Sequence, residues 1–140
     1  MDDTYYEFGT PADRWDRAQM FFEAKEYVTA ARILGGLVQE VPEQVGPRLL
    51  LARAYYHSAR LTKAETELRE VLERDPVEDY ARLMLGRTLE RQGRHAEAAP
   101  HLRMAHTMAG DVAAPETLAQ EQQEQQEQQE QQEQQEQQQG

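Results

Sequence analysis

The chain has 140 residues and a formal net charge of −11, from 26 acidic and 15 basic residues, and 39% of its residues are hydrophobic. This length suits a single domain of ordinary size. The absence of cysteine excludes disulfides, thiolate metal sites and a cysteine nucleophile. Because a net acidic surface repels phosphate, the charge argues against binding to nucleic acid or to anionic membranes.

The chain opens with Asp2 and Asp3, unlike a secretion signal. Its longest apolar stretches are far shorter than the roughly 20 residues that span a bilayer. We therefore expect a soluble, cytoplasmic protein without a membrane partner. The basic residues are almost all arginine, with Lys25 and Lys63 as the two lysines, and this bias favours a bacterial source.

Up to about residue 110 the apolar residues recur at steps of three and four, which is typical of amphipathic helices. The pattern predicts helices over residues 12–24, 28–41, 46–58, 62–74, 80–92 and 97–109. Thr29 and Thr62 are candidate N-caps for the second helix of the first two pairs.

Two features disturb this helical pattern. Gly35 and Gly36 lie in mid-helix, where each glycine costs about 1 kcal/mol relative to alanine, so we expect a tight contact with a neighbour to compensate. Pro100 falls a few residues into the last predicted helix. A proline beyond the first turn costs about 3 kcal/mol, so we expect that helix to begin late.

A period of 34 residues runs through the chain and divides it into three repeats, 11–44, 45–78 and 79–112. Small residues recur in the first and second helix of each repeat, and a residue that does not continue a helix recurs at each repeat end. These positions are Ala18, Ala52 and Gly86; Ala30, Ala64 and Ala98; and Pro42, Pro76 and Gly110. The small residues indicate that the two helices of each repeat cross closely.

With these positions in register, the chain resembles the tetratricopeptide repeat family, whose unit has 34 residues, small residues at the helix crossing and a terminal proline. The resemblance implies an all-α fold, an α-solenoid of three tetratricopeptide-like helix hairpins, in which the first helices line a concave groove. The chain departs from the family at one position, because the tryptophan common early in the unit is replaced by Arg14, Arg48 and Arg82.

Two segments flank the repeat domain 11–112. In residues 1–10, the aromatic side chains of Tyr5, Tyr6 and Phe8 predict either a lid over the first repeat or a contact surface for another chain. Residues 113–140 form a linker and an acidic tail in which glutamate recurs every third residue from Glu121. Because three residues turn a helix by about 300°, these glutamates circle the axis and leave no apolar face. We expect a Glu/Gln-rich tail that is disordered or a solvent-exposed helix.

The exposed stripe of each first helix follows from helical spacing and supplies the candidate groove residues. They are Trp15, Gln19, Phe22, Leu49, Arg53, Tyr56, His57, Tyr80, Leu83, Arg87, Glu90 and Arg91. Aromatic and arginine side chains are enriched in binding hot spots, and together they would suit an apolar peptide that bears carboxylates. The alternative is structural: Phe22, Leu49 and Leu83 belong to the core between repeats, and the arginines pair with acids of their own scaffold.

Catalytic and metal sites are not expected. The four histidines show no H-E-x-x-H spacing, and the chain has a single serine, Ser58, outside any nucleophile motif. His101, Met104 and Met108 share a helical stripe, which we interpret as the outer face of the last helix. Some family members hold a chaperone's terminal carboxylate with lysine, asparagine and arginine, but the corresponding positions here are Trp15, Gln19, Leu50, Tyr80 and Met84.

The sequence therefore predicts a non-enzymatic adaptor, without cofactor, that binds a segment of a partner protein in its concave groove. One alternative is a self-associating homodimer, supported by the uncovered last repeat, Gly35 and Gly36, and the aromatic N-terminal segment. A second alternative is autoinhibition, in which the acidic tail occupies the arginine-rich groove of its own chain. A flexible tail of about 30 residues reaches roughly 30 Å, which is far enough.

Overall fold

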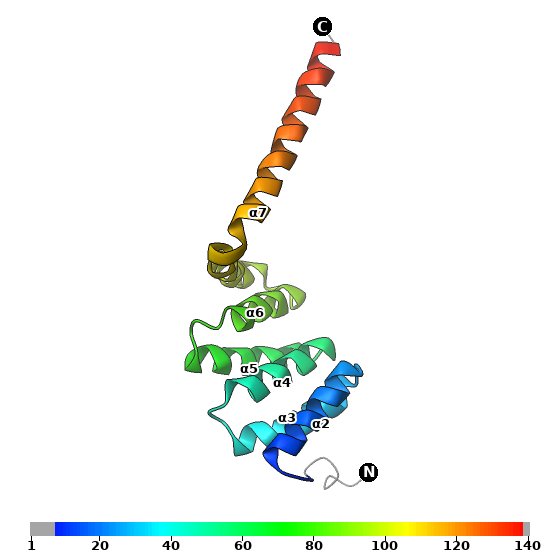
Figure 1. Ribbon diagram of the computed structural model, residues 1–140, viewed down its shortest axis with the longest axis vertical. Coiled ribbons are helices and arrows are strands. Elements are labelled where there is room, and N and C mark those ends of the chain that lie inside the picture. Colours follow the sequence, from blue (N-terminus) through cyan, green and yellow to red (C-terminus); the bar gives the residue numbers. More distant parts are fainter. Residues whose placement is uncertain (1–7, 139–140) are drawn as a thin grey trace. The chain divides into compact units, whose positions relative to one another are not determined.

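A computed structural model describes the backbone of residues 8–138. It describes the side chains of residues 8–108 and 122–138. Its helices are α2 (Pro11–Glu23), α3 (Tyr27–Glu40), α4 (Val45–His57), α5 (Leu61–Arg74), α6 (Asp79–Arg91) and α7 (His95–Gln138) (Figure 1). Within residues 8–138 no strand occurs. The predicted all-α solenoid is confirmed, and α2 to α6 begin and end within one residue of the predicted bounds.

The helices pack in chain order, α2 on α3, α3 on α4, α4 on α5 and α5 on α6, as hairpins stacked on one another (Figure 1). Two compact units divide the chain, one ending at Ala105 and the other beginning at His106. In the first unit the predicted small residues lie at the helix crossings and are fully buried: Ala18, Ala30, Ala52, Ala64 and Ala98. Close helix crossing is therefore the physical reason for the 34-residue pattern.

The turn inside each hairpin repeats the same backbone geometry. Lys25, Ala59 and Gly93 have positive φ angles of 62°, 61° and 77°, and they too are 34 residues apart. The residue after each turn donates its N–H to a carbonyl five residues back, as Arg60 does to Tyr55 at 2.8 Å. This is the left-handed pattern that commonly ends a helix.

The predicted N-caps Thr29 and Thr62 are wrong. Helix α3 begins at Tyr27 and α5 at Leu61, so both threonines lie inside helices, and the N-cap residues Glu26 and Arg60 make no side-chain cap hydrogen bond. The left-handed turn brings the chain directly into the second helix, so the start of that helix is set by the backbone rather than by a capping side chain.

The expected late start of the last helix and the expected neighbour of the glycine pair are also wrong. Helix α7 begins at His95 despite Pro100, because the left-handed turn at Gly93 leads directly into it, as the equivalent turns lead into α3 and α5. A β-carbon at Gly35 or Gly36 would meet nothing within 4 Å, so no close contact with the described part of the chain offsets these glycines.

Arginine replaces the usual tryptophan by linking the two helices of a repeat. Arg48 is 9% exposed and forms an ion pair with Glu67 of α5, with 2.8 Å between Nη1 and Oε2. Arg14 likewise pairs with Glu40 at the end of α3. Arg82 donates to the carbonyl oxygen of Pro76 at 3.0 Å and lies 3.4 Å from Nδ1 of His101. A charged pair therefore links the two helices of each of the first two repeats at this position, whereas in the third repeat Arg82 makes polar contacts without an ion pair to any described side chain.

Helix α7 continues to Gln138, and residues 122–138 are exposed along their whole length. None of the described helices is both long and apolar enough to cross a membrane. The predicted lid residues Tyr5 and Tyr6 lie outside the described residues. Phe8 is described: Arg17 donates to its carbonyl oxygen at 2.8 Å, and the residue is 73% exposed.

Candidate binding groove

Arg53, near the C-terminal end of α4, lies between two aromatic rings from neighbouring repeats. Its guanidinium carbon is 4.8 Å from the ring centroid of Phe22 in α2 and 5.5 Å from that of Tyr80 in α6. The Nε atom is buried without a hydrogen-bond partner, and among the described side chains, those of residues 8–108 and 122–138, no carboxylate pairs with Arg53. The sequence-based alternative, in which Arg53 pairs with an acid of its own scaffold, does not hold for the described residues.

His57 extends this aromatic group. Its ring stacks on Tyr27 at 4.7 Å and 21°, and meets Phe22 edge to face at 5.8 Å. Burial lowers the pKa of His57 below the usual range, and the positive charges of Arg53 and Arg91 lower it further. The lowered pKa favours the neutral imidazole, which presents an aromatic surface.

Arg91, at the end of α6, completes the group. Its guanidinium carbon lies 4.6 Å from the ring centroid of Tyr56, and its Nη1 donates to the Tyr56 carbonyl oxygen at 2.9 Å. We call the whole group the aromatic–arginine cluster; it consists of Phe22, Tyr27, Arg53, Tyr56, His57, Tyr80 and Arg91. Three repeats contribute to it, so it exists only when the hairpins stack.

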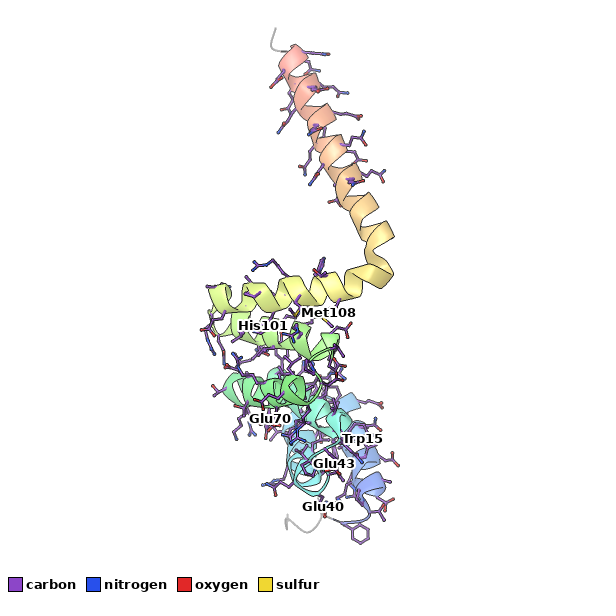
Figure 2. All side chains as sticks on the ribbon, turned by 90° about the vertical axis from the view of Figure 1, so that its left-hand side faces the viewer. Trp15, Glu40, Glu43, Glu70, His101 and Met108 are labelled. Atoms are coloured by element: carbon purple, nitrogen blue, oxygen red, sulfur yellow. The ribbon has the colours of Figure 1, made fainter. Side chains whose placement is uncertain are left out.

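Trp15, labelled in Figure 2, lines a pocket near the N-terminal ends of α2 and α4, and no residue of the aromatic–arginine cluster lines this pocket. The pocket has a volume of about 400 Å³. Its lining is mainly apolar: Pro11, Ala12, Trp15, Leu37, Gln44, Gly46 and Pro47. Two prolines and a glycine at helix starts leave the space open, because they place little side chain over it.

The remaining predicted groove residues differ in exposure. Gln19, Arg87 and Glu90 are exposed, whereas Leu49 and Leu83 are partly buried. Leu49 packs against the core cluster around Leu68 and Leu85, as the structural alternative predicted. Among the described residues, Arg87 makes no ion pair.

Sequence reasoning missed Tyr27 and most of the pocket. Tyr27 is the first residue of a second helix, and its ring reaches the groove only because α3 packs against α4. The sequence signal that could have indicated Tyr27 is an aromatic residue directly after the left-handed turn at Lys25. Among the side chains that the structure describes, those of residues 8–108 and 122–138, there is no group of three histidine or acidic residues that could hold a metal ion.

The sequence model of the tetratricopeptide repeat matches residues 21–86, from the end of α2 into α6. The chain belongs to the tetratricopeptide repeat family. Proteins of this family are in general non-enzymatic modules of protein interaction, and this tetratricopeptide repeat protein has the architecture of such a scaffold. Among curated proteins, none matches its sequence.

Several solved structures of MamA have a similar fold. MamA residues 41 to the end from Desulfovibrio magneticus RS-1 are 22% identical, with a TM-score of 0.65 over 70% of this chain and 55% of that chain. MamA of AMB-1 is 22% identical with a TM-score of 0.65 over 68% and 56%. MamA of MSR-1 is 21% identical with a TM-score of 0.64 over 67% and 54%. This tetratricopeptide repeat chain spans a little over half of these relatives, and identities this low show the fold alone.

Proposed function

We propose that the chain is a non-enzymatic adaptor that holds a segment of a partner protein in the groove lined by α2, α4 and α6. The observation that carries this proposal is Arg53, whose guanidinium carbon lies over the rings of Phe22 and Tyr80 while no acid of the described scaffold neutralises it. A buried or half-buried charge without a partner is costly. A bound carboxylate would remove that cost.

The surroundings of Arg53 suit a binding surface. Large, rigid aromatic rings bring contact area with little loss of side-chain entropy, and arginine offers several planar donors. Arg87 adds a further positive charge on the same helix, α6, that supplies Tyr80 and Arg91. The chain as a whole is acidic, so this local positive group would steer an acidic segment to the groove.

The test is affinity purification from the native host with the full chain as bait, comparing wild type with a variant that carries Arg53→Glu and Arg87→Glu. We expect the groove variant to lose its specific partner while its helical content by circular dichroism stays unchanged. A matched control carries Lys63→Glu and Arg74→Glu on α5, the same charge change outside the groove, and should retain the partner. Equal recovery by the groove variant and the wild type would remove the groove from the function.

Self-association is the second candidate function, and the open surface at Gly35 and Gly36 favours it. Helix α3 carries no side chain there, and no other residue of the described scaffold fills the space. A second copy of the chain could pack closely against this bare stretch of helix. Light scattering over a concentration series decides the question, because a monomer that persists at high concentration excludes a stable homodimer.

A further inference from the structure

The groove has two chemically different ends on one face of α4. Gly46 lines the apolar pocket beside Trp15, and Arg53 lies seven residues further along the same helix. Seven residues turn an α-helix by almost two complete turns and advance it by roughly 10 Å, so both residues are on one side. The same interval separates Trp15 from Phe22 on α2. The pocket and Arg53 are thus two points of one surface.

At the Arg53 end, the guanidinium can bind a carboxylate through its terminal Nη groups. Phe22 and Tyr80 lie against the guanidinium, and the Nε atom is covered by protein. The terminal Nη groups remain, and two parallel N–H donors match the two oxygens of a carboxylate. Lysine could not reproduce this planar geometry.

The end at Trp15 is built to accept an apolar side chain. Five of its seven lining residues are Pro11, Ala12, Trp15, Leu37 and Pro47, all apolar, and a pocket of about 400 Å³ has room for a leucine or phenylalanine side chain. The two ends together define a ligand through their separation of roughly 10 Å along α4. An extended chain advances about 3.3 Å per residue, so three residues cover roughly this distance.

We infer that the groove binds an extended segment of another protein in which an apolar side chain and an acidic side chain are about three residues apart. The apolar side chain enters the Trp15 pocket, and the carboxylate bonds to the Nη groups of Arg53. This inference rests on the adaptor function proposed above and adds the chemical class of the partner. Both charged side chains of the cluster, Arg53 and Arg91, are positive, and Arg87 adds a third positive charge on α6. We therefore expect an acidic occupant.

The experiment selects random twelve-residue peptides displayed on phage against the immobilised full chain. Enriched peptides are then synthesised, and their affinities are measured by fluorescence anisotropy. We expect an acidic residue about three positions from a leucine, phenylalanine or similar residue. Replacing that Glu by Gln in the peptide, or Arg53→Gln in the protein, should each weaken binding about tenfold to hundredfold, the range for a charge-assisted pair. The two changes together should cost little more than either one.

Three further variants complete the test. Trp15→Ala should weaken binding and abolish the preference for a large apolar residue, and two glycines inserted between the paired residues should abolish binding. Arg53→Lys keeps the charge and the aromatic contact, so it should fold if Arg53→Gln does not, and should bind at an intermediate level. Lys63→Gln, on α5 outside the groove, should bind as wild type.

The outcomes separate the two proposals. Peptides that depend on Arg53 and Trp15 but show no acidic residue, or no constant spacing, would overturn this inference and leave the adaptor function standing. The absence of any peptide that depends on these residues would overturn both. Peptide affinity that rises when the six tail glutamates are replaced by glutamine would assign the site to the chain's own tail instead. A dimer that Arg53→Gln dissociates would assign it to a second copy.

Discussion

Gly86 of α6 faces Leu102 of α7 at the closest helix crossing of the last repeat. A β-carbon at Gly86 would lie 2.6 Å from both Cγ and Cδ2 of Leu102 and 3.4 Å from its backbone nitrogen. Ala18 and Ala52, at the corresponding crossings of the first two repeats, are fully buried with their methyl groups in place. At this crossing a β-carbon would therefore require the Leu102 side chain to move, whereas glycine fits without any shift.

This contact predicts opposite effects for the same substitution at two helical glycines. Gly36→Ala should raise the free energy of unfolding by about 0.5–1 kcal/mol, because alanine favours the helix and the site is open. Gly86→Ala gains the same propensity but crowds Leu102, which costs about 1–3 kcal/mol in a packed core. We expect a net loss of about 1 kcal/mol, measured by urea denaturation. Destabilisation by Gly36→Ala would instead indicate that α3 packs against something at that point.

The left-handed turns predict a stabilising substitution. Ala59 has a φ of 61°, a conformation that costs a residue with a β-carbon roughly 1 kcal/mol. Ala59→Gly should therefore raise the free energy of unfolding by about 0.5–1 kcal/mol. Gly93→Ala, at the equivalent turn of the third repeat, is the reciprocal control and should lower it by a similar amount. Equal and opposite shifts of the urea midpoint would support this account, whereas a loss of stability in Ala59→Gly would contradict it.

The Arg48–Glu67 ion pair predicts that removing one partner is worse than removing both. Glu67→Gln leaves a guanidinium that is 9% exposed without its carboxylate, and we expect a loss of about 2 kcal/mol in the free energy of unfolding. Replacing both residues by methionine should recover most of that loss, because no unpaired charge remains. Glu70→Gln at the exposed Arg74–Glu70 pair is the control and should change stability by less than about 0.5 kcal/mol. A double variant no better than Glu67→Gln would contradict this.

His101 predicts that the fold weakens in mild acid. Burial lowers the pKa of His101, the neighbouring charges of Arg82 and Arg69 lower it further, and Glu97 opposes them. Because the unfolded chain binds the proton more readily, stability is complete above the unfolded pKa of about 6.5 and falls as the pH drops through the lowered folded value. His57 acts in the same direction. His101→Gln keeps an acceptor for Arg82 without titrating, so thermal unfolding between pH 7 and pH 5 should show a smaller loss than in wild type.

Much of the first unit could be predicted because its information is local and periodic. Five of the predicted helices agree with α2 to α6 to within one residue, since helix formation depends on spacing along the chain. The exceptions have a common cause. Thr29 and Thr62 have the chemistry of N-caps, but the turns before them are left-handed at Lys25 and Ala59, which are not glycine. Pro100 was expected to delay its helix, but α7 begins at His95, two residues after the left-handed turn at Gly93.

The sequence by itself determined the 34-residue period, the helices and the small residues at their crossings, because all three depend on distances along one chain. Only the tertiary structure decided which side chains meet: that Arg53 lies between Phe22 and Tyr80, that Tyr27 joins His57, and that Trp15 lies at a separate pocket. These contacts join different hairpins, and they depend on the rotation and packing of one repeat on the next. No spacing within a single helix records that rotation.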